Sequence, residues 1–214
     1  MITTVRKIAD AERRSATTEI ISTNGTDWLP VLHASGVTVR PLRASDAESL
    51  HRMLSVEEVS RFISPPPTTV EAYVRFIEWT AAEAAAGRNI TFGLVPAGCE
   101  CAVGFIQIRR LSRSFDVAEW GFALGSAFWG TGIFEASARV VLGFAFETVG
   151  VERLEARACV ANGRGNGALM KCGAVCEALL RASFVKSGRR LDQYLWSITR
   201  DHWRATVPQA LLVH

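Results

Sequence analysis

Two glycines separated by one residue, just before an apolar helical segment, offer the clearest chemistry in the sequence. Gly130 and Gly132 lie between an expected strand over residues 117–124 and an expected helix over residues 130–150. The N–H groups at a helix N-terminus are unpaired and carry partial positive charge, and glycines let a ligand approach that backbone closely. The arrangement is typical of an anion site that suits a diphosphate. From spacing alone, a tight strand-to-helix turn explains the two glycines equally well.

Two other phosphate-binding motifs are excluded at this position. A Walker loop needs Gly-Lys-Ser/Thr, and no such triplet follows the glycines. A dinucleotide fingerprint needs a third glycine at the position where the chain has Glu135. The glycine pair therefore belongs to neither motif.

Glu119 is the candidate general base. Strand alternation puts it on the same face as Gly121 and Ala123, so we expect open space beside the carboxylate, which a substrate could fill. The alternative that stays open is a structural ion pair with Arg109 or Arg157.

These residues must be positioned by a mixed set of elements. Short apolar runs between turn residues predict strands, and longer periodic runs with caps predict helices. Thr68 and Glu71 form a capping box that is expected to open a long helix. Hairpin-like spacings dominate, with one strand–helix–strand crossover, so the fold class is α/β (α+β) with a mixed, mostly antiparallel sheet. We expect strands over 37–42, 90–95, 103–111, 117–124, 153–160, 177–185 and 191–199, and helices over 46–54, 56–63, 68–86, 130–150 and 165–172.

Composition excludes several classes of protein. The chain has 214 residues, of which 49% are hydrophobic and 21% charged, so it is expected to be globular and not disordered. A net charge of +3 does not argue for a nucleic-acid partner. The five cysteines include no Cys-x-x-Cys pair, so we expect no metal site and no disulfide framework, and the thiols suggest a cytoplasmic protein.

The chain is expected to form one main domain. Residues 1–36 are interpreted as an N-terminal arm, residues 37–204 as the domain and residues 205–214 as a C-terminal tail. The first 14 residues lack the apolar run of a secretory signal, and no apolar stretch approaches the roughly 20 residues of a membrane span. We therefore expect no membrane partner.

The run from Trp129 to Ala136 resembles the cofactor motif of the GNAT N-acetyltransferase superfamily. It is most similar to the branch of ribosomal-protein N-terminal acetyltransferases, in which Trp-Gly-x-Gly followed by Glu-Ala recurs. The family's second motif appears here as Asn162, Gly165, Leu169, Lys171 and Gly173. The likeness covers about residues 37–200, and it implies a GNAT fold with helices on both faces of the sheet and one splayed parallel strand pair.

The resemblance implies that acetyl-CoA is the co-substrate. The cofactor motif would cradle its diphosphate, and the preceding strand end would bind the pantetheine like an added strand. Asn162 would hold the pantetheine from the opposite strand end, next to the small residue at 165, and related acetyltransferases often carry a glutamate at the position of Glu119. The implied cofactor-binding residues are Phe122, Ala123, Leu124, Trp129, Gly130, Thr131, Gly132, Ile133, Phe134, Asn162 and Gly165.

The chain departs from the family pattern where a general acid is expected. Gly165 replaces the usual serine of this branch, and Met170 stands where many members have a tyrosine. These departures leave an alternative open, a non-catalytic module that binds acyl-CoA as a sensor or interaction domain.

The expected reaction is direct acetylation of a primary amine, on a peptide or protein N-terminus or on a small molecule. An α-amine with a pKa of ~7.8 is roughly 10–15% neutral at pH 7, whereas a lysine with a pKa of ~10.4 is about 0.04% neutral. A lysine acceptor therefore needs a base such as Glu119 far more than an N-terminal acceptor does. Residues 1–36 could also carry a homodimer contact.

Overall fold

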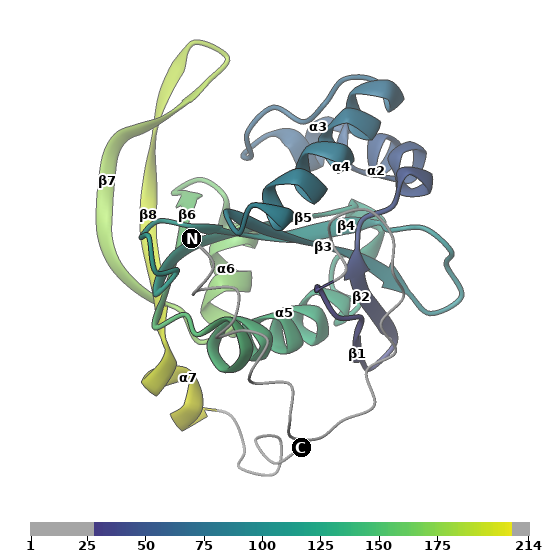
Figure 1. Ribbon diagram of the computed structural model, residues 1–214. Coiled ribbons are helices and arrows are strands. Elements are labelled where there is room, and N and C mark those ends of the chain that lie inside the picture. The colour runs from purple at the N-terminus through teal and green to yellow at the C-terminus, as the bar shows by residue number, and fades with distance from the viewer. Residues whose placement is uncertain (1–27, 207–214) are drawn as a thin grey trace.

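A single eight-stranded sheet organises the computed structural model, which describes residues 28–206 (Figure 1). The strand order is β1-β2-β3-β4-β5-β6-β8-β7, and every neighbouring pair is antiparallel except β5–β6. The expected mixed, mostly antiparallel sheet is therefore confirmed. The strands are β1 Leu32–Ala34, β2 Val37–Pro41, β3 Asn89–Pro96, β4 Gly104–Arg110, β5 Val117–Leu124, β6 Arg153–Cys159, β7 Val175–Lys186 and β8 Arg189–Thr199.

Helices cover both faces of the sheet (Figure 1). On one face, α2 and α4 bury Leu50, Tyr73 and Ile77 in a core that includes Ala123 of β5. On the other face, α5 packs Ala138 and Val141 against Trp120 and its neighbours. The helices are α2 Ala47–Leu54, α3 Glu57–Ser60, α4 Val70–Ala85, α5 Ile133–Gly143, α6 Gly163–Lys171 and α7 Arg200–Thr206, and a π-helical segment Phe144–Val149 extends α5.

The one parallel pair of strands is short and splayed. β5 and β6 are paired only at residues 117–119 and 153–155, although β5 continues to Leu124 and β6 to Cys159. Beyond these residues the two strand ends diverge, and the backbone edge of β5 that faces β6 has no strand partner. The expected splayed pair is thus confirmed, and it opens a gap next to Gly130 and Gly132.

Several element ends differ from the expected ones for local reasons. Thr69, and not Thr68, caps α4, because its Oγ1 accepts a hydrogen bond from the N–H of Ala72 at 3.1 Å. The segment expected to be helical from residue 130 begins at Ile133, because Gly130 and Gly132 both adopt left-handed φ angles. The expected second helix over 56–63 shortens to α3.

The structure describes only part of the expected N-terminal arm and none of the last residues of the expected C-terminal tail. Within the expected arm, β1 pairs with β2 and forms the first strand of the sheet. Residues 1–27 of that arm and residues 207–214 of the expected tail lie outside the described residues.

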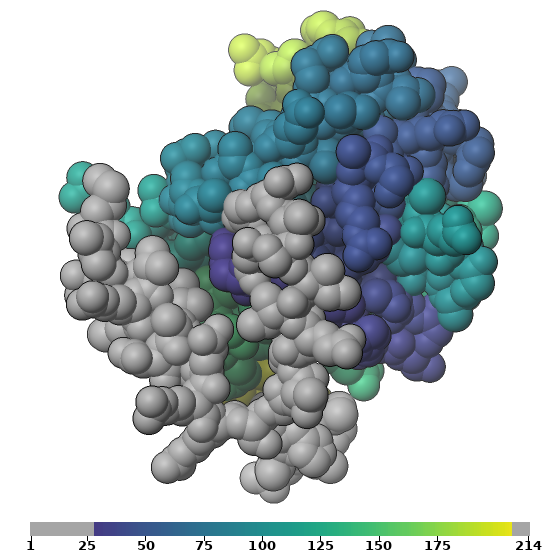
Figure 2. Space-filling model, turned by 45° about the vertical axis from the view of Figure 1, so that its right-hand side comes forward, coloured from purple at the N-terminus to yellow at the C-terminus, as the bar shows by residue number. Residues whose placement is uncertain are grey.

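The β7–β8 hairpin is bent by an irregular segment. The register shifts between Leu180 and Phe184, and within the shift Ala182 has a left-handed φ of 52° and donates its N–H to Asp192 Oδ1 at 2.7 Å. Near the tip of the hairpin, Lys186 Nζ donates to the carbonyl of Ser60 at the end of α3 at 2.9 Å, and Figure 2 shows this part of the hairpin next to the helices of that face.

Candidate active site

The loop between β5 and α5 presents a row of unpaired N–H groups. The N–H groups of residues 130–135 make no hydrogen bond to another described residue, and the first bond of the helix runs from Ala136 to the carbonyl of Gly132 at 3.0 Å. Gly130 and Gly132 have φ angles of 74° and 85°, and a Cβ built on either glycine would meet no atom within 4 Å. The space over the loop is therefore open to a ligand, and unpaired N–H groups of this kind can bind an anion.

Side chains around the loop fix its shape. The indole Nε1 of Trp129 donates to the carbonyl of Leu124 at 2.9 Å, which ties the start of the loop to the end of β5. Thr131 Oγ1 donates to the carbonyl of Phe128 at 2.7 Å. Phe134, in the first turn of α5, lies against Phe122 of β5 with ring centroids 4.1 Å apart. The loop is thus held rigidly although its backbone donors stay free.

The end of β5 offers part of its backbone to the gap. The carbonyl of Asp116 accepts hydrogen bonds from the N–H groups of Glu152 and Arg153, so strand alternation directs the backbone groups of even-numbered residues of β5 towards β6. Phe122 and Leu124 consequently face the gap, except that the Leu124 carbonyl is held by Trp129.

Ala123 does not share this orientation. Its backbone groups face β4, opposite Phe105, and its side chain is buried in the core under α2 and α4. Of the expected strand-end residues, Phe122 and Leu124 are therefore placed to bind a ligand through the backbone, and Ala123 only shapes the surface next to it.

Asn162 lies after β6 and caps α6 with its own side chain. Its Oδ1 accepts a hydrogen bond from the N–H of Gly165 at 2.9 Å. A Cβ on Gly165 would stand only 2.5 Å from Asn162 Nδ2, so a side chain at 165 would require the asparagine amide to shift.

One contact across the gap could not have been found from the sequence. The guanidinium carbon of Arg164, in the first turn of α6, stands 4.2 Å from the centroid of the Trp129 ring. The two residues are far apart in the chain, and no spacing pattern in the sequence indicates that they meet. The contact joins the segment after β6 to the segment after β5.

Glu119 is paired with arginines on both sides. Its Oε1 accepts a hydrogen bond from Arg157 Nη1 at 2.7 Å, and its Oε2 accepts one from Arg109. The sequence left open an ion pair of Glu119 with Arg109 or Arg157. In the structure, Glu119 pairs with both arginines. A Cβ on Gly121 would meet no atom within 4 Å, so open space does lie beside Glu119.

The Glu119 pair belongs to a row of charges across the sheet. On β6, Arg153 Nε donates to Glu155 Oε1 at 2.9 Å, and Arg153 also binds Glu177 of β7. Hydrogen bonds from Arg153 and from the hydroxyl of Ser197 lower the pKa of Glu177 to about 2. Alternation places this row on the face that carries α2 and α4.

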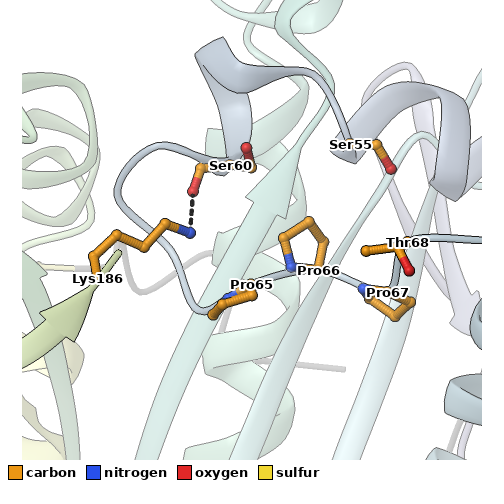
Figure 3. Close-up of a pocket in the computed structure, with 7 residues that line it drawn as sticks. All are labelled: Ser55, Ser60, Pro65, Pro66, Pro67, Thr68 and Lys186. Atoms are coloured by element: carbon orange, nitrogen blue, oxygen red, sulfur yellow. Dashed lines mark hydrogen bonds between the residues drawn. The ribbon is translucent and has the colours of Figure 1, made fainter. Parts of the chain in front are cut away.

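Two shallow hollows adjoin the hairpin tip. One, of about 290 Å³, is lined by Ser55, by Ser60, by residues 65–68 and by Lys186 (Figure 3). The other, of about 350 Å³, lies between Phe62, residues 159–161 at the end of β6 and residues 190–192 of β8. Lys186, at the end of β7, connects the hairpin to residues 60–63, because its Nζ also donates to the carbonyl of Ile63 at 2.9 Å.

Residues 28–206 hold no cluster of three His, Cys, Asp or Glu side chains that could bind a metal ion. Within the same residues, none of the helices has the length and apolar character needed to cross a membrane.

Comparison with known proteins finds similarity to acetyltransferases. Residues 37–175 match the family model described as "Acetyltransferase (GNAT) domain". The uncharacterized N-acetyltransferase YoaA of Bacillus subtilis (strain 168) is 24% identical over 172 residues, which are 80% of this chain and 97% of YoaA.

Solved structures share the fold. The ribosomal-protein-S5-alanine acetyltransferase of Vibrio fischeri has a TM-score of 0.72 at 18% identity, over 81% of this chain and 98% of its own. RimJ of Mycobacterium smegmatis, in complex with CoA-disulfide, has a TM-score of 0.70 at 23% identity, over 79% of this chain and 88% of its own.

Proposed function

Since the chain belongs to the GNAT acetyltransferase family and is an N-acetyltransferase, we propose that it transfers an acetyl group directly from acetyl-CoA to a primary amine, with an N-terminal α-amine as the preferred acceptor. The observation that carries the proposal is the row of unpaired N–H groups at residues 130–135, beside the unpaired edge of β5. The expected resemblance to GNAT N-acetyltransferases is confirmed, and its neighbours include ribosomal-protein acetyltransferases.

The β5–α5 loop and the end of β5 would bind different parts of acetyl-CoA. The N–H groups from Gly130 to Phe134 would receive the diphosphate, where several charge-assisted hydrogen bonds of ~1.5–3 kcal/mol each outweigh the helix dipole. The backbone of Phe122 and the N–H of Leu124 would pair with the amides of the pantetheine, and Asn162 would close the other side of the gap. Acetyl-CoA supplies an activated thioester whose thiolate leaves readily at neutral pH.

Glu119 remains the proposed base, but its two arginine partners restrict when it can accept a proton. Both carboxylate oxygens hold a guanidinium group, so accepting a proton from an ammonium requires that Arg109 or Arg157 release one oxygen. Such a restrained base suits an acceptor that is already partly neutral at pH 7. This consideration supports an α-amine over a lysine side chain as the acceptor.

A panel of amines tests the function. Purified protein would be incubated with acetyl-CoA and, in turn, a peptide with a free N-terminus, a peptide blocked at its N-terminus but carrying lysine, a polyamine and an aminoglycoside, with free thiol and product mass measured. We expect the peptide with the free N-terminus to be acetylated fastest. Tight CoA binding without thiol release for any amine would contradict the proposal and favour the non-catalytic acyl-CoA-binding module.

Three further expectations stay predictions. They are the cytoplasmic location, the homodimer contact through residues 1–36, and the absence of nucleic-acid and membrane partners.

A further inference from the structure

We propose that Arg164 is a cofactor-binding residue that holds the diphosphate of CoA against the N–H groups of the β5–α5 loop, with Trp129 as the platform on which its guanidinium rests. The inference rests on the proposed function and adds a residue to that site. It is carried by one contact, the guanidinium carbon of Arg164 over the Trp129 ring, 4.2 Å from the ring centroid.

Trp129 is a fixed platform. Its indole N–H is bound to the carbonyl of Leu124 at 2.9 Å, and its ring packs against both hydrophobic cores of the domain. The next residue in the chain is Gly130, where the row of unpaired N–H groups begins. A cation resting on this ring is therefore held within one residue of the anion site.

Arg164 reaches the platform from the other side of the gap. It belongs to the first turn of α6, after β6, whereas Trp129 follows β5. The two strands are no longer paired at these ends, so the Arg164–Trp129 contact spans the opening through which a ligand of both strand ends must pass. A diphosphate at the loop would thus lie between backbone donors on one side and the guanidinium on the other.

The guanidinium of Arg164 is available to such a ligand. Among the described residues it makes no ion pair and no side-chain hydrogen bond, whereas Lys171 of the same helix binds Glu135 at 2.9 Å. A guanidinium over an aromatic ring keeps N–H groups available for a second partner, and their fork matches the oxygens of a phosphate.

A structural role alone does not account for the position. Arg164 is exposed, and a cation–π contact at an exposed site adds little to stability. Replacing the arginine should therefore leave the fold intact, which makes ligand binding measurable in the variant.

Calorimetric titration of the full chain with three ligands tests the inference. CoA, 3′-dephospho-CoA and pantetheine would be titrated into the wild type, Arg164→Gln, Arg164→Lys and the control Arg113→Gln, which removes the same charge from the β4–β5 turn. We expect Arg164→Gln to weaken CoA and 3′-dephospho-CoA equally, by roughly tenfold, and to leave pantetheine unchanged. Arg164→Lys should lose less, because the charge remains without the fork, and Arg113→Gln should bind as the wild type does.

Other outcomes would overturn the assignment. Unchanged affinity in Arg164→Gln, or an equal loss in Arg113→Gln, would show that Arg164 does not contact the diphosphate. A loss for CoA but not for 3′-dephospho-CoA would move the contact to the 3′-phosphate and so contradict the inference. If the wild type bound none of the CoA ligands, the proposed function itself would fail. If the wild type bound CoA and Arg164→Gln bound it equally well, only the inference about Arg164 would fail.

Discussion

Arg157 and Glu119 form an ion pair across the first step of the gap between β6 and β5, with 2.7 Å between Nη1 and Oε1. Glu119 is the last residue of β5 that is paired with β6, and Arg157 lies two residues beyond its partner Glu155. The side chains of Glu119 and Arg157 therefore still join the two strands at a point where their backbones are no longer paired. An acceptor ammonium that enters here meets a carboxylate whose oxygens are in use, and it must compete with a guanidinium.

Replacing Glu119 with glutamine should lower turnover more for lysine acceptors than for α-amines. The substitution removes the proposed proton acceptor, and the neutral fraction of a lysine is roughly 300-fold smaller than that of an α-amine at pH 7. We expect kcat to fall by at least ~10-fold for a lysine peptide, in line with the usual contribution of a positioned base, and less for a peptide with a free N-terminus. Steady-state kinetics from pH 6 to 9 would show it, with the loss shrinking as pH rises.

Glu155→Gln is the matched control, because Glu155 lies in the same row of charges and binds Arg153. An equal fall in kcat for both variants, or an effect of Glu119→Gln on KM alone, would show that the row acts only by its charge and that Glu119 is not the base.

Substituting alanine for Gly132 should weaken CoA binding and slightly destabilise the fold. The φ of 85° is unfavourable for any residue with a Cβ and costs about 1–2 kcal/mol, and the new methyl group would lie in the open space over the loop. We expect at least a roughly tenfold rise in the Kd for CoA, from the loss of one or more charge-assisted hydrogen bonds. Calorimetry and urea unfolding would measure the two effects.

Gly121→Ala provides the comparison for Gly132→Ala. A Cβ at Gly121 also meets no atom within 4 Å, but its φ is not left-handed and it lies on β5 away from the loop. If both alanine variants bound CoA as the wild type does, the loop would not be the anion site.

The sequence predicted the sheet and the glycine loop because both depend on local signals. Strand alternation and the Gly130–Gly132 spacing are readable within a few residues, and the structure places each in the expected element. The Arg164–Trp129 contact and the double pairing of Glu119 depend on which strand ends meet in space. No periodicity in the chain encodes such distances, so the sequence could only leave the ion pair of Glu119 open and gave no sign of Arg164.

Capping was predicted only to within one residue for a related reason. Two consecutive threonines, Thr68 and Thr69, can both cap a helix, and in the structure the side chain of Thr69 accepts the N–H of Ala72, while the backbone carbonyl of Thr68 is bound to His51 Nε2 at 3.0 Å. Local preference treats the two positions alike, so the sequence could not choose between them.

Asp46→Asn should strongly destabilise the domain. Asp46 is fully buried, binds Arg40 through both oxygens at 2.8 and 2.9 Å, and also accepts the N–H groups of Ala102 and Arg43. Neutralising one partner of a buried pair leaves Arg40 with an uncompensated charge, which typically costs about 3–5 kcal/mol. Urea unfolding would measure it, with Glu83→Gln of the exposed Glu83–Arg88 pair as a control that should change stability far less.

The same carboxylate predicts how stability depends on pH. Burial would raise the pKa of Asp46, but the hydrogen bonds from Arg40, Ala102 and Arg43 outweigh it and hold the pKa below the ordinary value of 3.8. A lowered pKa in the folded state stabilises the fold above the unfolded value, and this contribution is lost as pH falls below about 4. The wild type should therefore lose stability below pH 4 more steeply than Asp46→Asn, and parallel curves for the two would contradict this explanation.

Lys186→Met should make the tip of the β7–β8 hairpin more mobile without changing the β5–α5 loop. The methionine keeps much of the apolar stem but loses the Nζ that donates to the carbonyl of Ser60 (Figure 3) and to the carbonyl of Ile63, both at 2.9 Å. Because these bonds tie the hairpin tip to the segment after α3, we expect faster hydrogen exchange in residues 184–191 and 57–63 and unchanged affinity for CoA. Lys171→Met, which removes an exposed ion pair with Glu135 on the other side of the sheet, should leave both segments protected as in the wild type. Equal protection of the hairpin tip in the wild type and in Lys186→Met would show that the bulge at Ala182 holds the tip without the lysine.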